Sequence, residues 1–380
     1  MISLRAKGKA VNVDEPLVAK VTTDKDDYGK VYLAKHKDDL LGVNLSRFKG
    51  VITTETDLEG LSINGKPLVY RAPFLSHLET DDIVVINQNG GVDTLFRKRS
   101  PHNALFITDR CNSNCLMCSQ PPKDIDDLAY HYEINAKLIP LIPKDTQELG
   151  ITGGEPTLLG ERLRELFVLL KEELPETEIH MLTNGRVFAW KNVVQSLSSV
   201  ENPRVVFGIP LYSDYYAQHD YIMQAKDAFA QTVLGLHNLA RYDQRIEIRI
   251  VLHKQSYTRL PQLARFIYKN LPFVEHIAFM GLEYVGYTPH NDALLWIEPS
   301  QYVGQLAEAV EYLDDFGMNV SIYNLPLCLL PQHLWKLCRK SISDWKREYL
   351  EECQKCRMLN ECGGVFATSR RYSEEIKAIQ

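Results

Sequence analysis

Short β-prone runs alternate with longer amphipathic stretches between residues 104 and 280, and this alternation most limits the folds open to the chain. Alternating strands and helices are typical of a parallel sheet covered by helices. The expected strands are 104–108, 148–152, 178–183, 204–210, 245–252 and 275–280, and the expected helices are 161–173, 187–197, 223–240 and 258–270. Six strand-helix units fill about 200 residues, less than a complete eightfold barrel needs. We therefore predict an α/β protein containing a partial (β/α)6 barrel that resembles a TIM barrel.

The sequence on either side of this region has a different pattern. Before it, short β-prone pieces are separated by Gly, Asn and Asp turns, which predicts a small β-rich N-terminal domain. After it, the last 60 or so residues show little periodicity and contain five of the eight cysteines. We expect three domains: the β-rich domain at 1–100, the partial barrel at 101–317, and an irregular cluster-binding extension at 318–380.

Composition excludes several classes of protein. With 380 residues that are 45% hydrophobic, the chain can bury a large core. A net charge of −6 and the lack of a long basic run argue against nucleic acid as a partner. No run of about 18 apolar residues could span a membrane, and residues 1–7 lack the apolar core of a signal peptide. We expect a cytoplasmic protein that binds neither nucleic acid nor membranes.

Three cysteines, Cys111, Cys115 and Cys118, follow the first expected strand. Three thiolates can hold three irons of a cubane cluster and leave the fourth iron open, whereas structural clusters normally have four cysteine ligands. The nearest other ligand types, His102 and His131, stand at no familiar spacing. Loops that follow barrel strands carry the chemistry of such folds. The spacing therefore predicts a [4Fe–4S] cluster with one open iron site.

A second motif, Gly153-Gly154-Glu155-Pro156, follows the second expected strand. Two glycines let the backbone approach a ligand closely, and the carboxylate and free carbonyls can accept hydrogen bonds from an amino group. Taken alone, this sequence is an ordinary turn. Its position at the end of the strand that follows the cysteine loop puts both motifs at the same mouth of the barrel. Together they favour a ligand-binding site.

These motifs resemble those of the radical S-adenosylmethionine (SAM) superfamily, and the resemblance covers roughly residues 103–290. It implies that the amino and carboxylate groups of SAM bind the open iron. It also implies that a reduced cluster cleaves SAM to a 5′-deoxyadenosyl radical, which abstracts hydrogen from a substrate.

The resemblance further implies which residues contact SAM, although it assigns no catalytic side chain. The glycine turn would bind the methionine amino group, and residues after the third and fourth strands would contact the ribose and methionine. Arg249 would pair with the carboxylate, with a solvated arginine on an edge strand as the alternative. Met117 stands where the family often has an aromatic residue against the adenine. The implied contacts are Met117, Gly153, Gly154, Glu155, Pro156, Thr183, Asn184, Ser213 and Arg249.

The C-terminal cysteines form a second group. Four thiolates are enough to complete an iron-sulfur cluster or a zinc site, and the resemblance here is to the auxiliary cluster domains of peptide-modifying radical enzymes. Cys338 could replace the first of them, but its surroundings predict one face of a helix and a thiol in the core. The expected ligands are Cys328, Cys353, Cys356 and Cys362.

Residues 105–122, together with the segments 323–328 and 341–345, resemble the maturase C proteins of the His-Xaa-Ser system. This implies a ribosomally made precursor peptide or protein as substrate, a companion radical SAM maturase, and a reductant protein such as a flavodoxin or ferredoxin. An exposed sheet edge in the N-terminal domain could capture an extended peptide. The alternatives are a radical enzyme acting on a small molecule and a non-catalytic iron-sulfur or zinc protein.

Overall fold

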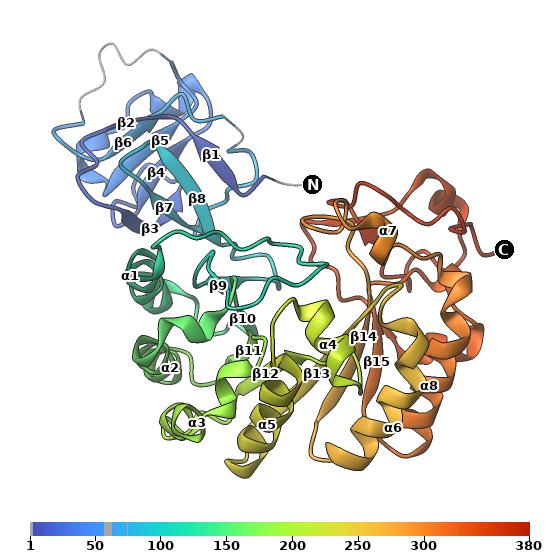
Figure 1. Cartoon of the computed structure of the whole chain (residues 1–380). Coiled ribbons are helices and arrows are strands. Elements are labelled where there is room, and N and C mark those ends of the chain that lie inside the picture. Colours follow the sequence, from blue (N-terminus) through green and yellow to red (C-terminus); the bar gives the residue numbers. More distant parts are fainter. Residues whose placement is uncertain (1–2, 57–62, 74) are drawn as a thin grey trace.

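The computed structural model describes residues 3–56, 63–73 and 75–380, which form two large sheets and a short C-terminal ribbon (Figure 1). The first sheet has the order β1-β8-β7-β3-β4-β5-β6-β2. Its strands are β1 (Arg5–Lys7), β2 (Lys9–Val11), β3 (Leu17–Thr22), β4 (Val31–Ala34), β5 (Gly50–Thr53), β6 (Leu68–Tyr70), β7 (Ile83–Ile86) and β8 (Gly91–Phe96).

The two ends of the first sheet meet at Gly8. Strands β1 and β2 lie at opposite ends of the strand order, yet this one residue separates them in sequence. A Cβ atom at Gly8 would lie 2.3 Å from the carbonyl oxygen of Tyr70, so the close approach requires glycine. The terminal strands are three residues each. The sheet therefore presents little edge to an incoming peptide, which weighs against the expected capture by strand addition.

The second sheet is parallel throughout and follows the chain in strict order from β9 to β16. Its strands are β9 (Ala104–Phe106), β10 (Glu148–Thr152), β11 (Glu178–Leu182), β12 (Val205–Pro210), β13 (Arg245–Leu252), β14 (His276–Gly281), β15 (Val320–Tyr323) and β16 (Cys338–Arg339). In the described residues β9 and β16 do not pair with each other, so the barrel stays open on one side. This confirms the predicted α/β partial barrel.

Helices cover the outer face of the second sheet, as Figure 1 shows for α1, α2, α3, α5, α6 and α8. The helices are α1 (Leu128–Leu138), α2 (Glu161–Glu173), α3 (Lys191–Ser198), α4 (Tyr216–Met223), α5 (Ala228–Arg241), α6 (Leu260–Asn270), α7 (Asp292–Leu295) and α8 (Val303–Asp315). None of them, in the part of the chain described, is long and apolar enough to cross a membrane.

The six expected strands all occur, but the sheet continues beyond them. Strands β15 and β16 lie in the stretch assigned to the irregular extension. The helix expected at 223–240 begins only at Ala228, as α5, because α4 ends at Met223 and Gln224 and Asp227 both have positive φ angles, of 51° and 58°. The short antiparallel ribbon of β17 (Arg347–Glu348) and β18 (Val365–Phe366) follows β16.

Strand β13 illustrates how the second sheet separates its two faces. Ile246, Ile248 and Ile250 are fully buried in the core beneath the helices. Because side chains alternate along a strand, Glu247 and Arg249 point to the opposite, inner face. The inner face of the barrel therefore carries charge, while the outer face is aliphatic.

We predict that Phe207→Ala in β12 lowers the free energy of unfolding by about 3–5 kcal/mol, because it leaves a cavity in the core. Phe207 is fully buried, and its ring centroid lies 5.3 Å from that of Phe188. Urea denaturation followed by circular dichroism measures the change. Leu234→Ala is the control, because Leu234 is 50% exposed on α5. Equal losses in both variants would contradict the assignment of this core.

Candidate functional site

The loop that carries Cys111, Cys115 and Cys118 leaves the end of β9 and is held by main-chain hydrogen bonds. The amide of Asn114 donates to the carbonyl of Met223 (3.1 Å), and the amide of Leu116 donates to the carbonyl of Ile222 (3.0 Å). The end of α4 therefore fixes the middle of the loop. All three thiols are half-buried.

Burial raises the pKa of all three loop thiols. It raises the pKa of Cys111 to about 11, with the carboxylate of Glu155 as the next cause. The pKa of Cys115 is raised by burial and then by Cys118 and Cys111, which shows that the three thiols are electrostatic neighbours. The thiols are therefore protonated near neutral pH, and binding of iron releases their protons.

The glycine turn packs against the base of the cysteine loop. The amide of Gly154 donates to the carbonyl of Thr108 (2.6 Å), and the amide of Glu155 donates to the carbonyl of Arg110 (2.8 Å). A Cβ atom at Gly154 would lie 2.0 Å from the oxygen of Arg110, and Gly153 has a φ of 148°. The two glycines thus allow the backbone of residues 108–110 to pack closely against the turn. From the sequence we expected them to make room for a ligand instead.

Glu155 is fully buried, and its carboxylate already accepts hydrogen bonds from the protein. The donors are the amide of Thr157 (3.0 Å), the hydroxyl of Thr157 (2.7 Å), the hydroxyl of Thr183 (2.7 Å) and the amide of Asn184 (2.7 Å). Glu155 therefore joins the turn after β10 to the turn after β11. Acceptors for an amino group at this turn are then its main-chain carbonyls, with Pro156 buried at the start of the next turn.

The turn after β11 also contacts the cysteine loop. The side-chain amide of Asn184 donates to Oδ1 of Asn112 (2.6 Å) and lies 4.0 Å from Sγ of Cys111. Arg186, which the sequence prediction missed, donates to the carbonyl of Asn112 and to Oγ of Ser113 (3.1 Å). The sequence signal that could have identified Arg186 was its position directly after Thr183-Asn184-Gly185.

Ser213 and Met117 are occupied by protein contacts. Ser213 follows β12, is fully buried, and donates its hydroxyl to Oε1 of Gln218 (2.7 Å). Met117 is 6% exposed in an apolar cluster that includes Ile222 and Leu295. Met117 lies within the cysteine loop and Ser213 follows β12, and the contacts of both residues with SAM stay predictions.

Arg249 is not on an edge strand, because β13 pairs with β12 on one side and β14 on the other. Its guanidinium donates to Oε1 of Glu247 at 2.5 Å. The solvated edge-strand alternative is therefore wrong. Burial and the thiols of the cysteine loop raise the pKa of Tyr212 well above its usual value, and the charge of Arg249 acts in the opposite direction.

Glu247 is the centre of a polar network that the sequence prediction missed. Its carboxylate is 4% exposed and lies 2.6 Å from Nδ1 of His276 and 3.3 Å from Nε2 of His180. Gly208 on β12 leaves room for these side chains, since its Cβ would lie 3.0 Å from Nε2 of His180. Burial opposes the charge of Glu247, but the two histidines and Arg249 outweigh it and hold its pKa below the usual value. The sequence signal that could have identified Glu247 was its position two residues before Arg249, on the same face of the strand.

The C-terminal cysteines influence one another electrostatically. The charge of Cys362 raises the pKa values of Cys328, Cys338 and Cys353, after burial, and Cys353 is in turn affected by Cys356. The helix predicted around Cys338 is wrong: Gln332–Leu337 is a short 3-10 helix, and Cys338 is extended at the start of β16. Cys338 nevertheless packs against the core of the barrel, as the sequence predicted, although it lies on a strand and not on a helix.

Neither set of thiols is arranged around a single metal ion: across residues 3–56, 63–73 and 75–380, no three His, Cys, Asp or Glu side chains form such a group. In a cubane cluster each thiolate binds a different iron, so the sulfurs lie farther apart than they do around one ion. The neighbouring thiols of the cysteine loop, with the glycine turn beside them, fit a cluster of this kind.

Residues 105–267 match the family model of the radical SAM superfamily. The chain contains a radical SAM domain. Domains of this superfamily use a [4Fe–4S] cluster and SAM, and the cysteine-rich C-terminal region is consistent with an auxiliary cluster. The matched span begins in β9 and ends in α6, and it includes the cysteine loop, the glycine turn and Arg249.

Similar proteins cover only part of the chain. The Fe-coproporphyrin III synthase of Methanosarcina barkeri (strain Fusaro / DSM 804) is 25% identical over 223 residues, which are 57% of this chain and 53% of the relative. The chain thus spans about half the length of this curated relative. Streptococcus suis SuiB bound to S-adenosylmethionine has a TM-score of 0.46 at 17% identity, covering 58% of this chain and 50% of SuiB. The anSMEcpe structure with AdoMet and Cp18Cys peptide has a TM-score of 0.44 at 18% identity, covering 58% and 62%.

We predict that Gly154→Ala destabilises the turn by about 3 kcal/mol and prevents loading of the cysteine-loop cluster, because its methyl group would overlap the carbonyl of Arg110. Iron content and the visible absorbance after anaerobic reconstitution measure this. The control is Gly304→Ala on α8, where a Cβ meets nothing within 4 Å. Normal iron loading by the Gly154 variant would refute the packing role of this glycine.

We predict that Glu247→Gln costs about 3 kcal/mol of stability at pH 7, because a buried partner of Arg249 loses its charge. A lowered carboxyl pKa contributes stability above the unfolded-state value, and that contribution is lost as the pH falls. The difference between the wild type and the variant should therefore shrink from pH 5 to pH 3. Urea unfolding measures it, with Glu172→Gln on the exposed side of α2 as the control. A difference independent of pH would contradict this charge assignment.

Proposed function

We propose that the protein is a radical SAM enzyme that modifies a ribosomally synthesised peptide or protein of the His-Xaa-Ser repeat type by hydrogen abstraction. The observation that carries the enzymatic part is the three-cysteine loop, held against the glycine turn inside a radical SAM domain. When bound, the [4Fe–4S] cluster supplies the electron that cleaves SAM to a 5′-deoxyadenosyl radical.

The chain's own residues bind and orient the two cofactors. Cys111, Cys115 and Cys118 hold the cluster, and the carbonyls of the turn Gly153–Pro156 accept hydrogen bonds from the amino group of SAM. Arg249 pairs with the SAM carboxylate while Glu247 fixes its guanidinium at 2.5 Å. The remaining proposed contacts, to the ribose, methionine and adenine, are Thr183, Asn184, Ser213 and Met117.

Two observations support a peptide substrate. The resemblance to the maturase C proteins extends beyond the cysteine loop into the C-terminal segments at 323–328 and 341–345. The cavity at the inner face of the barrel has a volume of about 1250 Å³, above the 300–1,000 Å³ or so that small ligands usually occupy. A segment of polypeptide fits a cavity of this size better than a small metabolite does.

The C-terminal extension contributes the second part of the proposal. Cys328, Cys353, Cys356 and Cys362 hold an auxiliary iron-sulfur cluster, and Cys338, which packs against the core of the barrel, is a thiol outside this set. In this proposal the β-rich domain ends at 100 and the extension begins at 318, although its first strands, β15 and β16, complete the sheet of the barrel. A companion radical SAM maturase and a reductant such as a flavodoxin or ferredoxin act with the protein in the cytoplasm.

A small-molecule substrate is the second candidate function. The observation that favours it is the 25% identity to a protein named Fe-coproporphyrin III synthase. Formation of an iron coproporphyrin from a tetrapyrrole precursor, with no modification of a peptide, would select this candidate.

We predict that the anaerobically reconstituted protein, given dithionite and SAM, forms 5′-deoxyadenosine, and that the Cys111/Cys115/Cys118→Ala triple variant forms none above background. Chromatography with mass spectrometry measures 5′-deoxyadenosine formed by the protein without further substrate, with a synthetic His-Xaa-Ser repeat peptide, or with a tetrapyrrole precursor of an iron coproporphyrin. The Cys338→Ala variant is the comparison for loss of a thiol outside the loop. Absence of product under all three conditions, with a reducible cluster present, would refute the proposed chemistry.

A further inference from the structure

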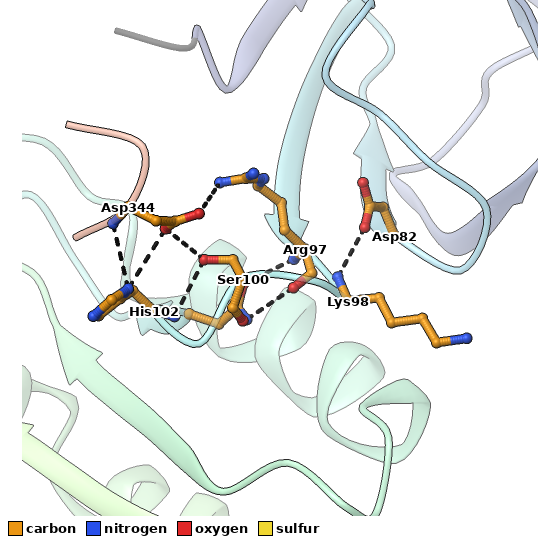
Figure 2. Close-up of polar contacts among 7 residues, drawn as sticks. Asp82, Arg97, Lys98, Ser100, His102 and Asp344 are labelled. Atoms are coloured by element: carbon orange, nitrogen blue, oxygen red, sulfur yellow. Dashed lines mark hydrogen bonds and ion pairs between the residues drawn. The ribbon is translucent and has the colours of Figure 1, made fainter. Parts of the chain in front are cut away.

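A cluster of hydrogen bonds joins the linker after β8 to the C-terminal extension (Figure 2). One carboxylate oxygen of Asp344 accepts from the hydroxyl of Ser100 (2.7 Å), and the other accepts from Nη1 of Arg97 (3.2 Å). The main-chain amide of Asp344 donates to Nδ1 of His102 (3.3 Å). We call these four residues the clasp. Burial alone would raise the pKa of Asp344, but the hydrogen bond from Ser100 and the charge of Arg97 hold it below its usual value.

The clasp lies across the open side of the barrel. Its linker residues run directly into β9, the first strand of the second sheet, and Asp344 follows β16, the last strand, by a few residues. In the described residues these two strands form no ladder with each other. Side-chain hydrogen bonds therefore connect the two borders of the sheet where main-chain pairing does not.

The same side of the barrel opens into the large cavity of about 1250 Å³. Its wall includes residues from each part of the chain: Arg5 and Asp93 from the N-terminal sheet, Tyr323 from the barrel, and Lys340 and Trp345 from the segment that carries Asp344. The clasp residues Arg97 and His102 also line it. The N-terminal sheet and the extension are thus walls of a cavity whose back is the polar inner face of the barrel.

The cavity wall is mixed in character, as a binding site for an extended chain requires. Aromatic side chains at Tyr323 and Trp345 offer apolar surface, while Arg5 is 80% exposed and paired with Asp93 at 3.1 Å. Polypeptide segments present both apolar side chains and main-chain polar groups along their length. One peptide segment can therefore contact the aromatic and the charged side chains of the cavity wall at the same time.

We infer that the substrate peptide is bound jointly by the N-terminal sheet, the inner face of the barrel and the C-terminal extension, and that the Asp344 clasp holds these walls together. This inference rests on the proposed peptide-modifying function. It assigns a substrate-binding role to the N-terminal domain through its face beside the barrel and not through its strand edges. Asp344, Ser100, Arg97 and His102 are positioning residues.

The first experiment tests the clasp without any substrate. Asp344→Asn and Ser100→Ala should each make the amides of residues 97–100 and 102–104 exchange hydrogen at least about tenfold faster, the effect of losing about 1.4 kcal/mol of local stability. The same variants should be cut faster by trypsin after Lys98 and Arg99. Glu308→Gln, which weakens a surface ion pair with Arg265 between α6 and α8, is the matched control. Exchange and cleavage equal to this control would overturn the clasp.

The second experiment tests the composite site. A photo-crosslinking residue, p-benzoylphenylalanine, replaces Arg5, Tyr323, Trp345 or, as a control outside the cavity wall, the 53% exposed Trp190. The probe is a fluorescein-labelled peptide of His-Xaa-Ser repeats, whose binding to the unsubstituted protein is first measured by fluorescence anisotropy.

Crosslinks from the first three positions, but not from Trp190, are expected. In the Asp344→Asn background the crosslinks from Arg5 and Trp345 should fall severalfold relative to that from Tyr323. Binding with crosslinks from Tyr323 alone would overturn the composite site while leaving the peptide function intact. Lack of binding to the unsubstituted protein would overturn the peptide substrate and the composite site together, and the hydrogen-exchange result would still decide whether the clasp exists.

Discussion

The buried carboxylate of Glu155 is the interaction on which the site depends. A carboxylate without partners inside a protein is costly, so its four hydrogen bonds fix both the group and the turns that supply the donors. Through those turns it also organises the cysteine loop, because Gly154 and Asn184 contact that loop directly. Three loops from three neighbouring strands are thereby fixed relative to one another before any cofactor binds.

The parts of the fold and site that depend on local sequence could be predicted. Strands β10 to β14 and helix α2 have strong periodicity, so they lie within one or two residues of their expected places. The cysteine loop and the glycine turn are short motifs whose spacing is visible in one stretch of chain. Their position at the same end of adjacent parallel strands followed from the topology of the fold.

The parts that depend on distant contacts could not be predicted. Ser100 and Asp344 are 244 positions apart, and no local pattern links them. In the sequence, Glu247 is a single acidic residue in an apolar strand. Its partners His180, on β11, and His276, on β14, are distant in sequence and are identified only by the fold. Strands β15 and β16 contain too few residues to show a period, and pairing with their neighbours defines them.

The joining of the first sheet at Gly8 has a consequence for the beginning of the chain. One extended segment, residues 5–11, supplies the outermost strand at both ends of that sheet. A protease that removed this segment would therefore expose one edge of β8 and one edge of β6 at the same time. The main-chain groups along both edges would then lack their hydrogen-bond partners. Unpaired borders of this kind attract other chains. Residues 5–11 thus protect the sheet against self-association as well as contributing to its fold.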